Sequence, residues 1–156
     1  MRVWRLCKAD HAGTAFTGEG AILYAGRWHH AGTPVIYTAE SRSLAVLEQL
    51  VHLSRNRLPP RFACFGVDVP DDLPVSVVAL ADLPADWQRY PGPPALRDLG
   101  TKWAESNASV VLAVPSAVVR GERNFLLNPR HPDFGRLGIG SAEPFALDER
   151  LLPARA

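Results

Sequence analysis

Four residues stand where folding alone does not call for their side chains: Arg27, Tyr37, Glu48 and Ser116. Arg27 lies in a Gly-Arg-Trp corner, where an indole can pack beneath a guanidinium that binds two phosphate oxygens at once. Glu48 borders the apolar face of an expected helix, where a shielded carboxylate could bind a sugar hydroxyl or stabilise a positive transition state. These two side chains suit a ligand that carries phosphate and sugar groups.

Each candidate residue also has a structural interpretation. Arg27 could be a surface arginine beside an anchoring tryptophan, and Glu48 could be a boundary glutamate paired with an arginine. Tyr37 could stack on a flat ring or could pack within the sheet. Ser116 directly follows an expected strand, so it could reach a cleft or cap a turn. Asn128 could bind a ligand or satisfy its own turn.

Several familiar catalytic and binding motifs are missing from the chain. It contains no GxxxxGK[ST] loop, and the glycines of residues 135–140 do not follow the GxGxxG order. If a nucleotide binds, arginines must therefore hold its phosphates. The five histidines show no metal-ligand spacing, so no metal site is expected. His29 and His30 are adjacent on an extended segment and point to opposite faces, which makes them a poor acid–base pair for a ribonuclease.

The elements that must position these residues are short. Alternating or apolar runs predict strands at residues 1–7, 34–39, 62–69, 75–80, 109–114, 124–127 and 144–151. Periodic apolar residues predict one helix from Ser41 or Ser43 to about Asn56 and a second from Pro94 to Asn107. The result is a mixed α+β fold with a few helices. Neither repeats nor linkers divide the chain, so residues 1–156 are expected to form a single domain.

Bulk composition narrows the function classes. The 156 residues are 47% hydrophobic and 21% charged, which excludes disorder, coiled coil and collagen for the whole chain. The net charge of +1 argues against direct nucleic-acid binding through many phosphate contacts. No apolar run is long enough to span a membrane, and the N-terminus has no secretory signal. Cys7 and Cys64 are therefore expected to be reduced thiols, and the protein is expected to be cytoplasmic.

Taken together, these residues resemble the RES family, the toxin half of bacterial RES–Xre toxin–antitoxin pairs. The family is named for an Arg, a Glu and a Ser, which match Arg27, Glu48 and Ser116. These three residues lie in the matching segments Gly26–Trp28, Leu44–Glu48 and Val114–Val119. Three further segments match, which are Val3–Arg5, Gly32–Ala39 and Asn124–Pro129, and the resemblance covers about residues 1–150. One departure is His29, because an Asn is expected after the Arg-Trp pair.

The resemblance implies a fold like that of ADP-ribosyltransferases, with short mixed and antiparallel strands in a split core around an NAD cleft. Arg5 and Arg27 would contact the pyrophosphate or the adjoining ribose, and Tyr37 would stack near nicotinamide. Glu48 would hold the ribose hydroxyl next to the reacting carbon, and Ser116 would orient part of the ligand or an attacking group. By the same resemblance, NAD would be bound by Arg5, Arg27, Tyr37 and Asn128.

The implied activity is consumption of NAD by cleavage of its nicotinamide–ribose bond, through phosphorolysis or hydrolysis. NAD would be a substrate rather than a cofactor, and inorganic phosphate a possible co-substrate. Two alternatives remain open, which are ADP-ribosylation of a protein target and a ribonuclease activity. The implied partner is an Xre-type antitoxin with a helix-turn-helix.

Overall fold

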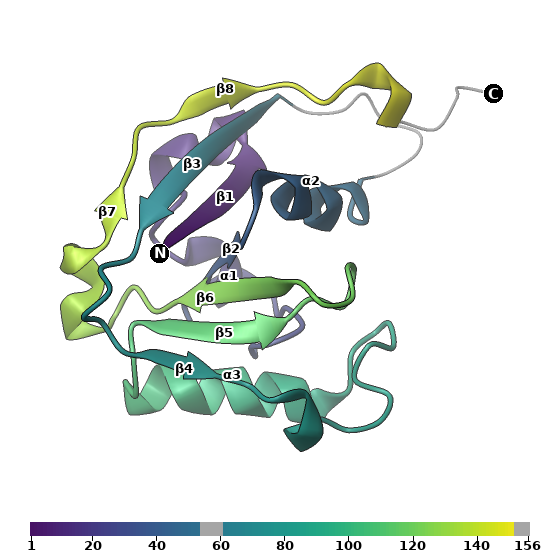
Figure 1. Ribbon diagram of the computed structural model, residues 1–156, viewed down its shortest axis with the longest axis vertical. Helices are drawn as coiled ribbons and strands as arrows, with labels where there is room; N and C mark the ends of the chain where they lie inside the picture. Colours follow the sequence, from purple (N-terminus) through teal and green to yellow (C-terminus); the bar gives the residue numbers. More distant parts are fainter. Residues whose placement is uncertain (54–60, 152–156) are drawn as a thin grey trace.

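A computed structural model describes residues 1–53 and 61–151 (Figure 1). Eight strands form its sheet: β1 (Arg2–Lys8), β2 (Ile36–Ala39), β3 (Phe62–Asp68), β4 (Val75–Val77), β5 (Val111–Pro115), β6 (Arg123–Leu127), β7 (Gly138–Ile139) and β8 (Glu143–Phe145). Three α-helices accompany them: α1 (Glu19–Leu23), α2 (Arg42–Leu50) and α3 (Pro94–Ser106). Four short 3₁₀ helices complete the described chain: η1 (Ala9–Thr14), η2 (Leu80–Asp82), η3 (Pro132–Arg136) and η4 (Glu149–Leu151).

The strands join one sheet in the order β4-β5-β6-β2-β1-β3-β7, with β8 also paired to β3. All pairs are antiparallel except β4 with β5, which is parallel. The predicted α+β class with short mixed strands is confirmed. None of the helices in residues 1–53 and 61–151 has the length and hydropathy of a membrane span.

The sheet opens between β1 and β2. In the described chain these strands share one registered pair, Trp4 with Ala39, whereas β1 pairs with β3 along its whole length. Continuing the Trp4–Ala39 register would bring Leu6 opposite Tyr37. The backbone bonds that such a continuation would make are therefore missing at the centre of the sheet, which corresponds to the split core that was expected.

Side chains satisfy the backbone carbonyls at this opening. The Leu6 carbonyl accepts a hydrogen bond from the Gln49 amide at 3.1 Å, and the Tyr37 carbonyl accepts one from Arg5 Nη1 at 2.9 Å. Because buried carbonyls without a partner are costly, these two bonds stabilise the opened sheet. Gln49 comes from α2 and Arg5 from β1, so the opening is held from two elements.

The two predicted helices are present. Ser41 caps α2 by accepting a hydrogen bond from the Leu44 N–H at 3.0 Å. Of the two predicted starts, Ser41 and Ser43, the first is therefore the correct one. The helix ends at Leu50, earlier than predicted, and the predicted end near Asn56 lies outside the described residues. α3 begins at Pro94 and ends before Asn107, which adopts a left-handed conformation with φ of 49°.

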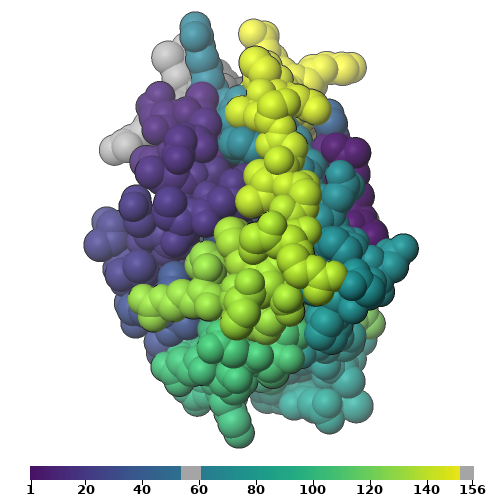
Figure 2. Space-filling model, turned by 90° about the vertical axis from the view of Figure 1, so that its left-hand side faces the viewer, coloured from purple at the N-terminus to yellow at the C-terminus, as the bar shows by residue number. Residues whose placement is uncertain are grey.

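Some predicted elements differ from the structure. The predicted strand over 144–151 is β8 followed by η4, so its second half was wrongly predicted. The predicted strand over 75–80 ends at Val77, because Leu80 begins a 3₁₀ turn. η1 and α1 lie between the strands predicted at residues 1–7 and 34–39, where the apolar residues show no clear periodicity. The C-terminal segment with β7 and β8 runs along one face of the molecule (Figure 2).

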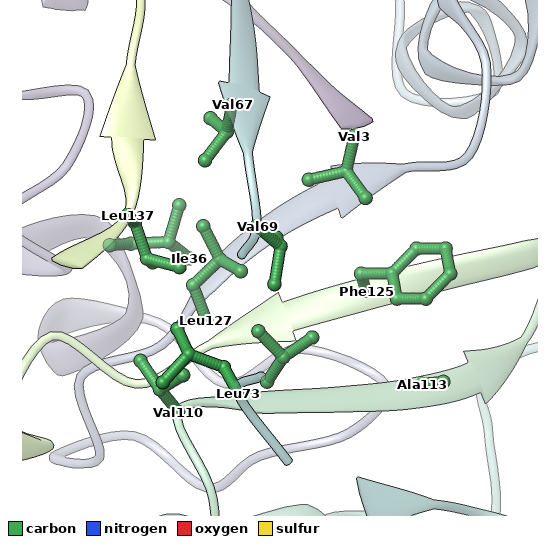
Figure 3. Close-up of a cluster of buried hydrophobic side chains, with 11 residues drawn as sticks. Val3, Ile36, Val67, Val69, Leu73, Val110, Ala113, Phe125, Leu127 and Leu137 are labelled. Carbon is green, nitrogen blue, oxygen red and sulfur yellow. The ribbon is translucent and has the colours of Figure 1, made fainter. Parts of the chain in front are cut away.

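Buried hydrophobic side chains hold the centre of the sheet together (Figure 3). One cluster brings together residues from β1, β2, β3, β5 and β6 with the segments that flank them: Val3, Ile36, Val67, Val69, Leu73, Val110, Val111, Ala113, Phe125, Leu127 and Leu137. A second cluster packs α3 against the other face of β5 and β6 through Leu96, Trp103, Leu112, Val114 and Leu126. The sheet is therefore anchored on both faces near its central strands.

Helix α3 seats the Gly26–His30 corner against the core. At Gly100 an added Cβ would lie 1.8 Å from the Trp28 carbonyl oxygen, so helix and corner touch through backbone atoms. Thr101 Oγ1 accepts a hydrogen bond from the His30 N–H at 2.9 Å, and Arg97 Nε donates one to the Gly26 carbonyl at 3.1 Å. One helix thus fixes the backbone that carries Arg27.

Gly100→Ala is expected to lower the free energy of unfolding by about 1–3 kcal/mol, since overpacking against backbone outweighs the gain in helix propensity. Gly135→Ala is the matched control, because an added Cβ there meets no atom within 4 Å. Urea denaturation of both variants measures the difference. Equal stability of the two variants would contradict the close helix–corner contact.

Candidate active site

A cleft of about 770 Å³ lies at the opening between β1 and β2. This volume falls within the roughly 300–1,000 Å³ range of small-molecule sites. α2 and the loop before α3 both contribute to it, and Figure 1 shows them on either side of the β5–β6 turn. Polar residues that line the cleft are Arg5, Arg27, Tyr37, Thr38, Glu48, Gln49, His52, Gln88, Tyr90, Arg97 and Asn124. The structure thus brings Arg5, Arg27, Tyr37 and Glu48 together.

Glu48 is held in place through one of its carboxylate oxygens. Ser116 Oγ donates a hydrogen bond to Glu48 Oε1 at 2.9 Å, and the Asn124 side-chain amide donates a second, very short one to the same oxygen. Among the described residues no hydrogen bond reaches Oε2. The carboxylate is therefore oriented by two buried side chains and keeps one oxygen free for a ligand.

Ser116 lies behind Glu48 rather than on the cleft surface. Its side chain is buried, and its hydroxyl accepts hydrogen bonds from the Val118 and Val119 N–H groups at 3.1 and 3.0 Å. Ser116 thus caps a turn and, with the same hydroxyl, orients Glu48. Direct contact with a ligand, as the family resemblance suggests, is not what this position favours.

The Tyr37 hydroxyl is fixed by the residue that departs from the family pattern. His29 Nδ1 lies 2.8 Å from this hydroxyl, and His29 Nε2 lies 3.0 Å from the Tyr24 carbonyl oxygen. A carbonyl only accepts, so Nε2 carries the proton and Nδ1 accepts from the Tyr37 hydroxyl. The hydroxyl in turn accepts from the Trp28 N–H at 3.2 Å. Both hydrogen-bonding roles of Tyr37 are therefore used within the protein.

Burial sets the protonation of this pair. Desolvation lowers the pKa of His29, and hydrogen bonds to the backbone offset only part of that effect. Desolvation also raises the pKa of Tyr37 above its ordinary value. Both side chains are hence neutral at pH 7, and Tyr37 presents an uncharged ring to the cleft.

The arginines give the cleft its charge. Arg27 Nη1 donates to the carbonyls of Trp87 and Arg89 at 2.8 and 3.0 Å, and desolvation lowers its pKa, partly offset by the nearby Glu48 charge. Arg5 Nε is buried and has no hydrogen-bond partner among the described residues. Desolvation lowers the Arg5 pKa as well. These two guanidinium groups favour an anionic ligand, because a bound anion would accept a hydrogen bond that Arg5 Nε does not make to any described residue.

Arg97 and Asn124 belong to the cleft but were not singled out in the sequence. Neither Arg5, Arg27 nor Arg97 forms an ion pair with a described residue. The cleft is therefore lined by three guanidinium groups and by one carboxylate, that of Glu48. Arg97 follows the buried Leu96 on α3, and the helix sequence suggests that Arg97 lies on the solvent-exposed face. Only the packing of α3 shows that Arg97 lines the cleft. Asn124 is the second residue of β6. Because neighbouring side chains of a strand point to opposite faces, its position beside Phe125 was the sequence signal that could have placed it on the cleft side.

Asn128 does not reach this cleft. Its buried amide donates hydrogen bonds to the Ala104 carbonyl at 2.9 Å and to Asn107 Oδ1 at 3.0 Å. Its side-chain oxygen accepts from the Arg130 N–H at 3.0 Å. The side chain therefore satisfies its own turn and the end of α3, which is the structural interpretation left open above.

The described residues thus form an α+β domain whose cleft is lined by one carboxylate and by three arginines without an ion pair to a described residue. The RES domain model matches residues 2–148, and the chain belongs to the RES domain family. Toxin Res of Photorhabdus laumondii is 37% identical over 156 residues, 99% of each chain. Toxin Res of Yersinia enterocolitica is 39% identical over 153 residues, which cover 97% of this chain and 99% of that one.

Two further proteins are similar to this chain. A protein of a Sphingobium species named Prs ADP-ribosylating toxin is 35% identical over 138 residues, which cover 87% of this chain and 86% of that one. The crystal structure of the M. tuberculosis MbcT-MbcA toxin–antitoxin complex contains a chain with a TM-score of 0.73 and 19% identity. The match covers 92% of this chain and 83% of that one, and it shows a shared fold.

Stability is expected to depend on pH through His29. Its pKa is lowered in the folded protein, so below the ordinary value of about 6.5 the unfolded chain binds a proton that the folded chain does not. The free energy of unfolding should therefore fall between pH 7 and 5.5, by at most about 1.4 kcal/mol per pH unit for this one group. Urea denaturation across this range measures the slope.

His29→Asn is expected to show a shallower slope than the wild type, because Asn does not titrate. Exposed His11, replaced by Asn, serves as the control and should keep the wild-type slope. An unchanged slope in His29→Asn would show that this histidine is not held neutral by the fold.

Proposed function

We propose that this chain is the toxin of a toxin–antitoxin pair and that it consumes NAD by cleaving the nicotinamide–ribose bond. One observation carries the proposal. The Glu48 carboxylate is fixed through Oε1 with Oε2 left open, in a cleft whose three arginines lack a carboxylate partner among the described residues. Relatives of similar length named as toxins support the first half of the proposal.

The arginines suit the diphosphate of NAD. A guanidinium binds phosphate oxygens in a fixed fork, and charge-assisted bonds of this kind are stronger than neutral ones. Arg5 and Arg27 are partly shielded from water, so their attraction for an anion is less screened than on the surface. Their contribution would be to orient the substrate rather than to make or break bonds.

Glu48 suits the reacting ribose. Nicotinamide in NAD is a cationic leaving group, so its departure needs no general acid and leaves an oxocarbenium-like sugar. A carboxylate already oriented by Ser116 and Asn124 stabilises that positive charge without reorganising. Glu48 Oε2, which has no partner among the described residues, would accept a hydrogen bond from a ribose hydroxyl. Tyr37, with its hydroxyl held by His29, would present a rigid ring for the nicotinamide to stack on.

The group that receives the ADP-ribose distinguishes two versions of this function. Water or inorganic phosphate as acceptor would make the protein an NAD-degrading enzyme. The relative named as an ADP-ribosylating toxin favours a second candidate, transfer to a protein side chain. A ribonuclease gains no support, because His29 is buried with both ring nitrogens bonded and His30 pairs with Asp98 at 2.7 Å.

The proposed partner is an Xre-type helix-turn-helix antitoxin that covers the cleft, and the proposed compartment is the cytoplasm. The similar fold in the MbcT-MbcA toxin–antitoxin complex supports an antitoxin partner in general terms. Apolar side chains at the cleft, Val51 and Val118, are exposed in the isolated chain and would be available for such a contact.

Glu48→Gln is expected to keep the fold but to lower kcat for NAD by about 10²–10³-fold, by analogy with the loss of single electrostatic stabilisers. The assay follows loss of NAD by purified protein with and without inorganic phosphate and identifies the ribose product. Glu105→Gln, on the exposed face of α3, is the control and should behave as wild type. Absence of NAD loss from the wild type, with either acceptor, would refute degradation.

Ser116→Ala is expected to reduce kcat less than Glu48→Gln, because Asn124 still bonds Oε1. KM should stay near the wild-type value, since Ser116 acts through Glu48 rather than on the substrate. Loss of the turn cap should also lower stability by about 1 kcal/mol. Ser106→Ala, at the exposed end of α3, is the control. A change confined to KM would indicate that Ser116 contacts the substrate instead.

A further inference from the structure

We propose that the loop before α3 and Arg97 form a subsite for a nucleoside monophosphate, which in NAD would be the adenosine monophosphate half. This inference deepens the proposed function and rests on it for the identity of the whole substrate. The residues concerned are Gln88, Tyr90 and Arg97, all of which line the cleft. None of them was a candidate site residue in the sequence, and none forms a hydrogen bond with Glu48 or its two donors.

Tyr90 supplies a flat ring that the fold itself does not use. Its side chain is 83% exposed, the highest value among the large apolar and aromatic residues of the described chain. A tyrosine left open at the wall of a cleft loses little on binding a flat base, because stacking removes apolar area that folding left in water. Stacking on an aromatic side chain tolerates any base, since each base has a π-face.

The loop that carries Tyr90 is held in place. Arg27 Nη1 donates to the carbonyls of Trp87 and Arg89, on either side of Gln88. At Gly92 an added Cβ would lie 2.9 Å from Arg27 Nη1, so the loop packs directly against this guanidinium. The Trp87 ring lies 6.5 Å from the Trp28 ring, which anchors the loop to the buried corner. Tyr90 is thus presented on a fixed backbone.

Arg97 supplies a positive charge for a phosphate in the same cleft. Its Nε donates to the Gly26 carbonyl at 3.1 Å, which fixes the stem, while its terminal nitrogens form no hydrogen bond or ion pair with a described residue. The Gln88 side chain likewise has no hydrogen bond to a described residue and offers both a donor and an acceptor to a base edge. A ring, an amide and a cation together match the chemistry of a nucleoside monophosphate.

The lining of the cleft and the contacts of Arg27 agree with this assignment. Glu48 is the only carboxylate that lines the cleft among the described residues, so the reacting ribose belongs beside it. Arg27 lies close enough to Glu48 for that charge to affect its pKa, and it also contacts the loop. A diphosphate at Arg27 would therefore direct the second ribose and its base toward Gln88 and Tyr90.

Binding of AMP, followed by NMR titration, tests the subsite without any turnover. Wild type should bind AMP, and Tyr90→Ala should weaken that binding by about tenfold, the middle of the range for loss of one base–aromatic stack. Tyr90→Phe keeps the ring and should bind AMP as wild type does. Ribose 5-phosphate lacks the base, and its binding should be the same in all three proteins but weaker in Arg97→Ala.

Turnover of two substrates tests the same inference in the complete reaction. Tyr90→Ala should raise KM for NAD by about tenfold with kcat unchanged, and it should leave KM for nicotinamide mononucleotide unchanged, because that substrate has no adenosine. A wild type that binds no AMP, or a Tyr90→Ala variant that binds it equally well, overturns the subsite. A wild type that binds AMP through Tyr90 but leaves NAD intact refutes the NAD-cleaving function and preserves the subsite.

Discussion

The opening of the sheet between β1 and β2 is the constraint on which the candidate site depends. A regular ladder would have placed backbone groups of Leu6 and Tyr37 against each other and left no room for a ligand. Instead Gln49 and Arg5 complete the hydrogen bonding of these carbonyls, so the sheet stays open without buried unsatisfied carbonyls at that point. The same Arg5 that stabilises the opening also contributes charge to the cleft. The Arg5 side chain therefore both stabilises the opened sheet and lines the cleft.

Glu48 and its surroundings show how a site can be rigid while remaining open to a ligand. Two donors, from the β5–β6 turn and from β6, converge on one oxygen, and the other oxygen has no hydrogen-bond partner among the described residues. The arginines follow the opposite arrangement, because each is tied to backbone carbonyls and not to a carboxylate. Opposite charges are thus kept in one cleft without being neutralised by direct contact, which preserves their electrostatic effect on a bound molecule.

The sequence predicted much of this arrangement, and the exceptions have physical causes. Arg27, Tyr37 and Glu48 were recognisable because a guanidinium corner, a strand aromatic and a boundary carboxylate are unusual for their local positions. Arg97 was not, because an arginine on an amphipathic helix is ordinary until the helix is docked. Asn128 matched a family motif, yet its amide is used within its own turn and by α3. Local pattern identifies a residue type, whereas its partners are set by contacts between distant parts of the chain.

The central position of β6 has a consequence for the synthesis of the protein. β6 lies between β2 and β5 in the sheet, and it carries Asn124, which orients a carboxylate on α2. A nascent chain that has not yet released residues 123–127 from the ribosome lacks both the strand that joins β2 to β5 and the side-chain donor to Glu48. Cleft residues 5, 27, 37, 48 and 97 are all translated earlier, so they wait for β6 before they can assemble. Assembly of the cleft thus depends on a strand that follows all five of these residues in the sequence.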